Sequence, residues 1–249
     1  MMHVCRLGRS ELINGDRLAM SNAQQQRLDE LVARRRQGEP VAYLTGVREF
    51  WSLELNVSSA TLIPRPETEL LVEIALECIP HDAPWTIADL GTGSGAIALA
   101  VAKERPHCRV VATDLSLAAL DVATSNAEKL GLTNVKIRAG DWLAPLAGET
   151  LDMILSNPPY IRSDDPHTRE GDVRFEPPLA LNAGPEGLES IRHIALHARR
   201  HLRPGGWLMF EHGWDQADAI SSLLHQHGYR AIVCHRDLAG HDRVTGCRT

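Results

Sequence analysis

The sequence predicts an α/β fold built on a mostly parallel sheet of seven strands, and two observations lead to this prediction. From residue 86 onward, short apolar runs alternate with helical patterns, which is typical of a sheet covered by helices on both faces. The last two apolar runs are separated only by a short polar loop, so the final strand is expected to be antiparallel. The functional loops should therefore gather at the carboxyl ends of the parallel strands.

Each element of this domain is placed by the spacing of its apolar residues. Strands are expected at 86–90, 110–113, 135–138, 153–156, 207–211, 231–235 and 244–248. Helices are expected at 96–104, 117–130, 187–201 and 215–227. An earlier helix should begin at 65–67, where a proline stands near the first turn beside an acidic residue. We assign residues 65–249 to this main domain.

The residues before the main domain follow a different pattern. Ser21 and Gln24 form a capping box, in which the hydroxyl and the amide satisfy each other's free backbone N–H groups. Gly38 and Pro40 should end the helix that begins there. We therefore expect residues 1–40 to form a small helical segment.

The stretch 41–64 is richer in aromatic and β-branched residues than its surroundings. This composition favours extended structure. We predict a β-hairpin that pairs 49–55 with 56–63 and connects the helical segment to the main domain.

Composition excludes several classes of protein. The 249 residues carry 26 Lys and Arg against 32 Asp and Glu, a net charge of −6, which argues against a protein that coats nucleic acid. The longest apolar run, 96–102, has seven residues and is far too short to span a membrane. Five scattered cysteines without a C-x-x-C pair favour reduced thiols and a cytoplasmic location. None of the 12 histidines stands in a metal-ligand pattern, so no metal is expected.

The first loop whose residues suit ligand binding is rich in glycine and follows the first strand. Its residues are Asp89, Leu90, Gly91, Thr92, Gly93, Ser94 and Gly95. Alternate glycines let the backbone approach a ligand, and the start of the following helix offers free N–H groups. The spacing differs from that of dinucleotide-binding and P-loop motifs, so a tight structural turn remains an alternative.

Acidic residues follow the second and third strands. Asp114 lies about 20 residues after the glycines, where a carboxylate can accept two hydrogen bonds from a ribose diol; a helix cap is the alternative. Asp141 and Trp142 follow the third strand. The acid can accept a hydrogen bond from an exocyclic amine and the indole can cover a purine, although a tryptophan packed under a loop is equally compatible with the sequence.

The fourth loop, Asn157-Pro158-Pro159-Tyr160, follows the fourth strand directly. Two consecutive prolines cannot continue a central strand, so they form a stiff bend that fixes the asparagine and the tyrosine at the sheet edge. The Asn157 side-chain oxygen and the Pro158 carbonyl can each accept one N–H of a planar –NH₂ group. The Tyr160 ring can cover one face of that plane.

These loops, in this order, resemble those of class I methyltransferases that depend on S-adenosylmethionine and act on amide or amino nitrogen. Three further stretches are similar to the N5-glutamine methyltransferases of bacterial peptide chain release factors, the HemK/PrmC family. They are EPVAYLTGVREFW at 39–51, LIPRPETE at 62–69 and FEPPLAL at 175–181. The resemblance runs from about residue 20 to the end of the chain.

The resemblance implies a class I, Rossmann-like methyltransferase domain that uses S-adenosyl-L-methionine as cofactor. It implies that the partner is a release factor, whose Gly-Gly-Gln loop supplies the glutamine, and that no nucleic-acid substrate or membrane is involved. When the family's residue roles are transferred to this sequence, Gly91–Gly95 hold the methionine part of the cofactor. Asp114 then holds the ribose, and Asp141 with Trp142 holds the adenine. Residues 157–160 hold the glutamine amide, with Asn157, Pro158 and Tyr160 as the catalytic set. Glu176 is expected at the substrate rim or as a surface acid.

The resemblance also leaves questions open. The segment before residue 39 looks shorter than the family's five-helix docking domain by roughly one helix pair. Phe50 could close over the cofactor or belong to the core. A methyltransferase of a ribosomal-protein glutamine would share the loop chemistry, and DNA adenine methyltransferases share the Asn-Pro-Pro-Tyr motif.

Overall fold

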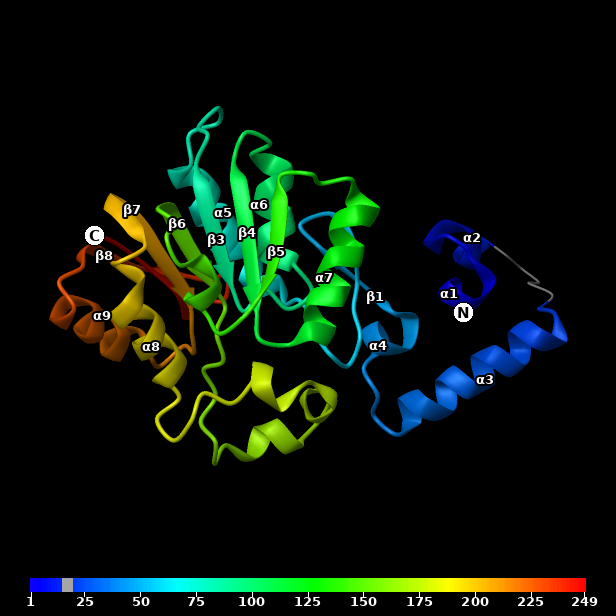
Figure 1. Cartoon of the computed structure of the whole chain (residues 1–249). Helices are drawn as coiled ribbons and strands as arrows, with labels where there is room; N and C mark the ends of the chain where they lie inside the picture. Colours follow the sequence, from blue (N-terminus) through cyan, green and yellow to red (C-terminus); the bar gives the residue numbers. More distant parts are fainter. Residues whose placement is uncertain (15–19) are drawn as a thin grey trace.

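The computed structural model describes residues 1–14 and 20–249. Within these residues, seven strands form one main sheet in the order β5-β4-β3-β6-β7-β9-β8, and a separate two-stranded hairpin, β1–β2, lies beside it (Figure 1). None of the helices in this part of the chain is long and apolar enough to cross a membrane.

Six of the seven strands of the main sheet lie within two residues of their expected bounds, and the strand expected at 207–211 begins earlier, at Leu202. The seven strands are β3 Thr86–Leu90, β4 Arg109–Asp114, β5 Val135–Ala139, β6 Leu151–Ser156, β7 Leu202–Glu211, β8 Arg230–Arg236 and β9 Asp242–Arg248. β9 is inserted between β7 and β8 and runs antiparallel to both, whereas the other neighbouring pairs are parallel. The predicted antiparallel final strand is therefore confirmed.

Helices cover both faces of the main sheet. α5 Glu69–Cys78, α6 Ala96–Glu104 and α7 Leu117–Leu130 pack on one face, and α8 Glu189–Ala198 and α9 Ala217–Gln226 pack on the other. Along β3, Ile87 faces the first group, whereas Ala88 and Leu90 face the second, as the two-residue period of a strand requires. The chain thus has a core on each side of one sheet.

The N-terminal segment forms short helices beside the main domain. They are α1 Met2–Cys5, α2 Arg9–Asn14, α3 Asn22–Arg36 and α4 Val41–Thr45. Ser21 and Gln24 make the predicted capping box at the start of α3, in which both reciprocal hydrogen bonds are present. Figure 1 shows α3 reaching away from the sheet, with α1 and α2 folded back alongside it.

The predicted hairpin was wrong in its extent. β1 Val47–Phe50 pairs with β2 Leu53–Asn56, so both strands lie nearly within the first strand that we predicted, and 57–64 is a loop. Residues of α4 are helical rather than extended. Two adjacent residues with positive φ, Trp51 and Ser52, make the tight turn that the sequence does not signal, because neither is glycine or asparagine.

The hairpin is fastened to the main domain by Asn126 of α7. This buried side chain accepts from the Asn56 backbone N–H at 2.7 Å and donates to the carbonyls of Asn56 at 3.0 Å and Ser94 at 2.9 Å. The same residue therefore holds both the connector and the glycine-rich loop in place.

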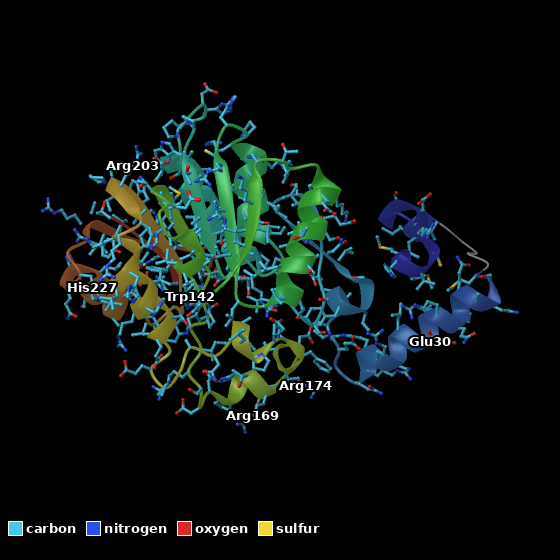
Figure 2. All side chains as sticks on the ribbon, viewed as in Figure 1. Glu30, Trp142, Arg169, Arg174, Arg203 and His227 are labelled. Carbon is cyan, nitrogen blue, oxygen red and sulfur yellow. The ribbon has the colours of Figure 1, made fainter. Side chains whose placement is uncertain are left out.

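A long connection between β6 and α8 folds beneath the carboxyl end of the sheet. It contains three short 3₁₀ turns, Pro166–Arg169, Val173–Phe175 and Pro178–Ala180, and Figure 2 shows Arg169 and Arg174 on it. Gln216 ties its two ends together by donating from Nε2 to the carbonyls of Tyr160 at 3.0 Å and Gly187 at 3.1 Å. We call residues 161–187 the flap segment.

Candidate active site

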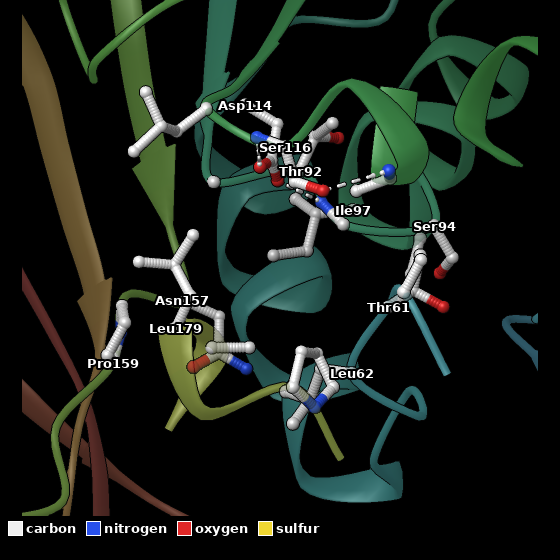
Figure 3. A pocket seen from close by; sticks show the side chains of 18 of the residues that line it. Thr61, Leu62, Thr92, Ser94, Ile97, Asp114, Ser116, Asn157, Pro159 and Leu179 are labelled. Atoms are coloured by element: carbon white, nitrogen blue, oxygen red, sulfur yellow. Dashed lines mark hydrogen bonds between the residues drawn. The ribbon is translucent and has the colours of Figure 1, made fainter. Parts of the chain in front are cut away.

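A cavity of about 510 Å³ opens at the carboxyl ends of the central strands. Its walls come from Ser190 and from six stretches of the chain, at 60–68, 91–97, 114–119, 140–142, 157–159 and 177–182. Figure 3 shows Asp114 and Ser116 at one side of this cavity and Asn157 with Pro159 at the other. The four loops singled out by their sequence therefore meet in one space.

Asp89 organises the glycine-rich loop from within the protein. Its carboxylate is buried, and Oδ2 accepts hydrogen bonds from the Thr92 hydroxyl at 2.6 Å and the Ala98 backbone N–H at 3.2 Å. Burial raises the pKa of Asp89 to about 7. Asp89 does not line the cavity; it holds in shape the loop that does.

The loop needs glycine at two positions for different reasons. Gly95 has φ +87° at the start of α6, and a Cβ there would lie 2.9 Å from Leu99 Cδ1. Gly91 has φ +71°, and a Cβ there would lie 3.2 Å from the ring of Trp142. The indole thus lies directly against the glycine backbone, so the first and third loops form one wall.

Asp114 shapes the loop and also faces the cavity. Oδ2 accepts from the Gly93 backbone N–H at 2.9 Å and Oδ1 from the Ser116 backbone N–H at 2.8 Å. Each carboxylate oxygen has a second lone pair for a further donor. The helix-cap alternative was wrong, because Ser116 caps α7 by accepting from the Ala119 backbone N–H at 3.2 Å. Asp114 is a turn residue whose carboxylate also lines the cavity.

Trp142 is held by its backbone as well as by its ring. Its φ is +44°, and its carbonyl accepts from the Thr113 hydroxyl at 3.0 Å. Asp141 lines the same part of the cavity. A non-glycine residue with positive φ is uncommon and costs backbone energy, so the surrounding structure fixes this turn firmly.

Asn157 contacts Thr68, a residue that no sequence motif singles out. Its Nδ2 donates to the Thr68 hydroxyl at 3.2 Å, so Oδ1 is the amide atom left to accept from a ligand. Thr68 is buried at the end of the 3₁₀ turn η1, Pro66–Thr68, and it lines the cavity. The residue lies within the quoted stretch 62–69, but no feature of the sequence pairs it with Asn157.

Tyr160 lies deeper than Asn157 and contacts a buried acid. Its hydroxyl donates to Glu211 Oε1 at 3.5 Å, and burial raises the pKa of the tyrosine. Glu211, the last residue of β7, is 1% exposed, and burial raises its pKa to about 7. From the sequence, Glu211 is predicted only to end a strand, and no functional role is predicted for it.

Glu176 is neither a free rim residue nor a surface acid. Its side chain is fully buried and pairs with Arg65 at 2.6 Å, while Arg65 itself lines the cavity and is one-third exposed. Burial raises the pKa of Glu176, and the neighbouring Arg65 opposes that rise. The pair joins the flap segment to the start of the main domain.

The predicted residues thus divide into two sets. Those that line the cavity are Gly91, Thr92, Gly93, Ser94, Asp114, Asp141, Trp142, Asn157 and Pro159. Asp89, Gly95, Pro158, Tyr160 and Glu176 stand behind the wall. Phe50, 1% exposed, belongs to the core. Residues that we did not predict also line the cavity, among them the exposed apolar Leu115 and Leu179 at its rim.

These residues fit S-adenosylmethionine. The cavity has the size typical of a cofactor site. At one side it offers a glycine loop at a helix start and the carboxylate of Asp114, which suit the amino-acid and ribose parts of the molecule. The acids and the indole of the neighbouring wall suit a cationic, purine-bearing ligand.

Fold and site together define a class I methyltransferase that depends on S-adenosylmethionine. The family model "Methyltransferase small domain" matches residues 67–171. A methyltransferase from Pyrococcus furiosus has a TM-score of 0.60 at 19% identity, covering 92% of this chain and 98% of that one. The Thermus thermophilus 16S rRNA N2 G1207 methyltransferase, in complex with AdoMet and guanosine, has a TM-score of 0.57 at 20% identity, covering 82% and 49%. At these identities the likeness is one of fold.

Closer relatives narrow the class to a family. The release factor glutamine methyltransferase of Xylella fastidiosa is 51% identical over 245 residues, covering 98% of this chain and 89% of the relative. That of Escherichia coli K12 is 49% identical over 243 residues, covering 98% and 87%. The model "PrmC N-terminal domain" matches residues 1–46. The chain belongs to the release factor glutamine methyltransferase family, which confirms the resemblance found in the sequence.

Proposed function

We propose that this protein transfers a methyl group from S-adenosylmethionine to the side-chain amide nitrogen of the glutamine in the Gly-Gly-Gln loop of bacterial release factors. The observation that carries the proposal is the placement of Asn157. Its amide is held by Thr68 on one side and lies on the cavity wall opposite Asp114. Family membership supports the same substrate class.

The difficulty of the reaction lies in the nucleophile. An amide nitrogen attacks poorly because its lone pair is delocalised into the carbonyl. The cofactor supplies a methyl group made electrophilic by a sulfonium. The site must therefore hold the nitrogen in line with that methyl group, and orientation of this kind contributes several kcal/mol.

We assign the orienting contacts to residues 157–160. The Asn157 Oδ1 accepts one N–H of the substrate amide, and we assign the other N–H to the Pro158 carbonyl. Tyr160 stands behind the cavity wall, so we assign its ring to bracing the bend and not to covering the amide plane. Two prolines make the bend stiff, so the acceptors are in place before the substrate arrives. No titratable base is required, because the attacked amide becomes strongly acidic and loses its proton to a carbonyl or to water.

The cofactor contacts follow the arrangement of the other loops. We assign Gly91–Gly95 to the methionine part, Asp114 to the ribose diol, and Asp141 with Trp142 to the adenine. Asp89 and Gly95 act by shaping the loop. We propose that the helical segment 1–40, joined by the connector 41–64, helps dock the release factor. We also propose a cytoplasmic location, because the scattered cysteines favour reduced thiols.

A methylation assay tests the function directly. The protein is incubated with labelled S-adenosylmethionine and, separately, with a release factor, a large-subunit ribosomal protein and DNA. We expect label on the release factor, and a mass spectrum of its loop peptide should show one added methyl on the glutamine. Label that appears only on the ribosomal protein or only on DNA contradicts the proposed substrate.

A further inference from the structure

We propose that Arg65 and Glu176 form a charge-neutral pair whose guanidinium binds a backbone carbonyl oxygen of the substrate peptide, beside the target glutamine. The proposal deepens the function above and rests on it, because it needs a peptide substrate in the cavity. The two residues come from the start of the main domain and from the flap segment, 111 positions apart in the chain.

Arg65 is a cation in a cavity whose other charged residues are acids. Among the lining residues that the structure describes, it is the only Lys or Arg, and Asp114 and Asp141 are the only acids. An uncompensated guanidinium would repel the sulfonium of the cofactor, because like charges interact strongly in a site that is shielded from water. A cation at this place therefore requires a counterion.

Glu176 supplies the counterion from behind the wall. Its side chain is fully buried, and Oε1 accepts from Arg65 Nη2 at 2.6 Å. Within residues 1–14 and 20–249, its other oxygen, Oε2, is buried and has no hydrogen-bond partner. The guanidinium is thus the group that compensates for burying this charge, and removing it would leave a buried carboxylate alone. The carboxylate in return holds the guanidinium in one place and cancels its charge.

The guanidinium keeps donors for a ligand. Glu176 uses Nη2, and the part of the chain that the structure describes provides no hydrogen-bond partner for Nε or Nη1 of Arg65. The side chain is one-third exposed and lines the cavity. An arginine presents its N–H groups as a planar fork that matches oxygen acceptors. The ligand of Arg65 is therefore a carbonyl or carboxylate oxygen.

The position of Arg65 favours an oxygen of the peptide substrate over one of the cofactor. Its backbone carbonyl accepts from the Thr68 backbone N–H at 3.1 Å, and the Thr68 hydroxyl accepts from Asn157. Figure 3 shows Leu62, which precedes this turn, on the same side of the cavity as Asn157 and away from Asp114. Arg65 thus belongs to the side of the cavity that we assign to the glutamine.

The substrate backbone can use this contact better than the reacting side chain can. A cation on the oxygen of the reacting carboxamide would draw electrons from its nitrogen and slow the attack on the methyl group. A backbone carbonyl lies outside that conjugated group. Glycines beside the glutamine expose their carbonyls, because they have no side chain to shield them. The contact therefore fixes the peptide without weakening the nucleophile.

Affinities for cofactor and product test the charge balance without any protein substrate. S-adenosylmethionine carries a sulfonium charge that S-adenosylhomocysteine lacks, so the ratio of their Kd values, measured by calorimetry, reports the charge of the wall. Glu176→Gln leaves Arg65 uncompensated and should weaken the cofactor relative to the product by about three- to tenfold. Loosening of the flap segment would weaken both ligands alike and cancels in the ratio.

Two further variants sharpen this measurement. Arg65→Lys keeps the balance of charge and should retain the native ratio. Asp152→Asn removes a carboxylate at the amino end of β6, far from the carboxyl ends of the strands where the cavity lies, and is the control for Glu176→Gln. It should also retain the native ratio, because its charge is lost at a distance from the bound sulfonium.

Steady-state kinetics with the release factor test the peptide contact. A lysine offers a point charge and no planar fork, so Arg65→Lys should raise KM for the release factor about tenfold while kcat changes less than about threefold. Its Kd for S-adenosylmethionine should stay within about twofold of the native value. Arg203→Lys, the same substitution at the partner of Asp152, is the control and should leave KM unchanged.

Three results would each overturn the proposal: a native Kd ratio in Glu176→Gln, a native KM in Arg65→Lys, or a loss of cofactor affinity in Arg65→Lys. The last result would assign Arg65 to the carboxylate of the cofactor. If the native enzyme labels the ribosomal protein and not the release factor, the function above fails, and KM measured with the labelled protein still tests the contact. Label on DNA alone would overturn both.

Discussion

Asn157 shows how a neutral side chain is prepared for catalysis. It directly follows Ser156, the last residue of β6, the next two residues are prolines, and its amide nitrogen donates to the Thr68 hydroxyl. Each of these features restricts the conformations of Asn157 in the free protein, so less conformational entropy is lost when the substrate binds. The motif made Asn157 predictable from the sequence, because two prolines after a buried strand leave few other conformations. Thr68 was not predictable, because the contact joins residues 89 positions apart.

Replacing Asn157 by alanine should separate chemistry from cofactor binding. We expect Asn157→Ala to lower the methylation rate by about 10²–10³-fold, comparable to the loss of one oriented polar group. Calorimetry should show little change in affinity for S-adenosylmethionine. Asn22→Ala, at an exposed asparagine of α3 outside the cavity, is the control and should keep its rate at saturating release factor within about twofold. Unchanged turnover in Asn157→Ala would remove this residue from the mechanism.

Asp89 should make stability depend on pH. Its pKa is raised from 3.8 to about 7, so between these values the folded protein holds a proton that the unfolded chain has released. The contribution of Asp89 to stability is therefore full below the ordinary pKa and is lost as pH rises through about 7. Asp89→Asn should reduce the fall in unfolding free energy between pH 5 and 8, measured by urea titration.

The control for Asp89→Asn is the same substitution at an exposed aspartate. Asp82→Asn removes a carboxyl from an exposed side chain after α5 and serves as this control. The difference in slope between the two variants isolates the buried carboxyl, because other titrating groups contribute equally to both. Equal slopes for the two variants would show that Asp89 does not hold a proton at neutral pH.

Among the elements, the flap segment depends most on contacts made outside itself. Its short turns bury little, and it is held by Gln216 at its ends and by the Arg65–Glu176 pair in its middle. Arg35 of α3 also pairs with Asp172 at 2.8 Å, which links the N-terminal helices to the same segment. Because both partners of that last pair are well exposed, its contribution is small.

Breaking the buried pair should loosen the flap segment selectively. Glu176→Gln should cost about 1–3 kcal/mol, because a buried partner is lost and Arg65 keeps its charge. The exposed Arg162, Arg169 and Arg174 provide trypsin sites, so cleavage within 161–187 should accelerate while the remainder of the domain resists. Glu186→Gln, which breaks an exposed pair with Arg192, should change the cleavage rate little. Equal cleavage rates in both variants would contradict this role.

Local signals placed some elements far better than others. α6 and α7 lie where their apolar periodicity predicts, and β3 matches residue for residue. The hairpin was misplaced because its turn uses Trp51 and Ser52 at positive φ, a conformation that packing enforces against propensity. α4 was missed because its five residues are too few to show a period.

At the scale of the whole molecule, the site exists because parallel strands end at one edge. The loops after β3, β4, β5 and β6 meet there, and the connector and the flap segment close the remaining sides (Figure 1). A cofactor in this cavity would contact the loops after β3, β4, β5 and β6 at the same time. Its binding should consequently stabilise the fold as a whole.

Thermal unfolding measures that stabilisation. At about 100 times its Kd, S-adenosylmethionine should add about 2.7 kcal/mol to the free energy of unfolding. For a chain of this size the midpoint should rise by roughly 5–10 °C. Methionine alone, at the same concentration, is the control and should give a much smaller shift. No shift at cofactor concentrations that support methylation would show that the cavity is not where the cofactor binds.

The sequence by itself determined the order of the elements, the sheet edge that carries the site, and the loops that bear the chemistry. Each of these depends on local patterns of apolar residues, glycines and prolines, which act over a few positions of the chain. The tertiary structure decided which side chains stand behind those loops: Thr68 and Glu211 beside Asn157 and Tyr160, and Arg65 against Glu176. Such pairings join residues 51–111 positions apart, and they depend on strand register and packing that no local pattern encodes.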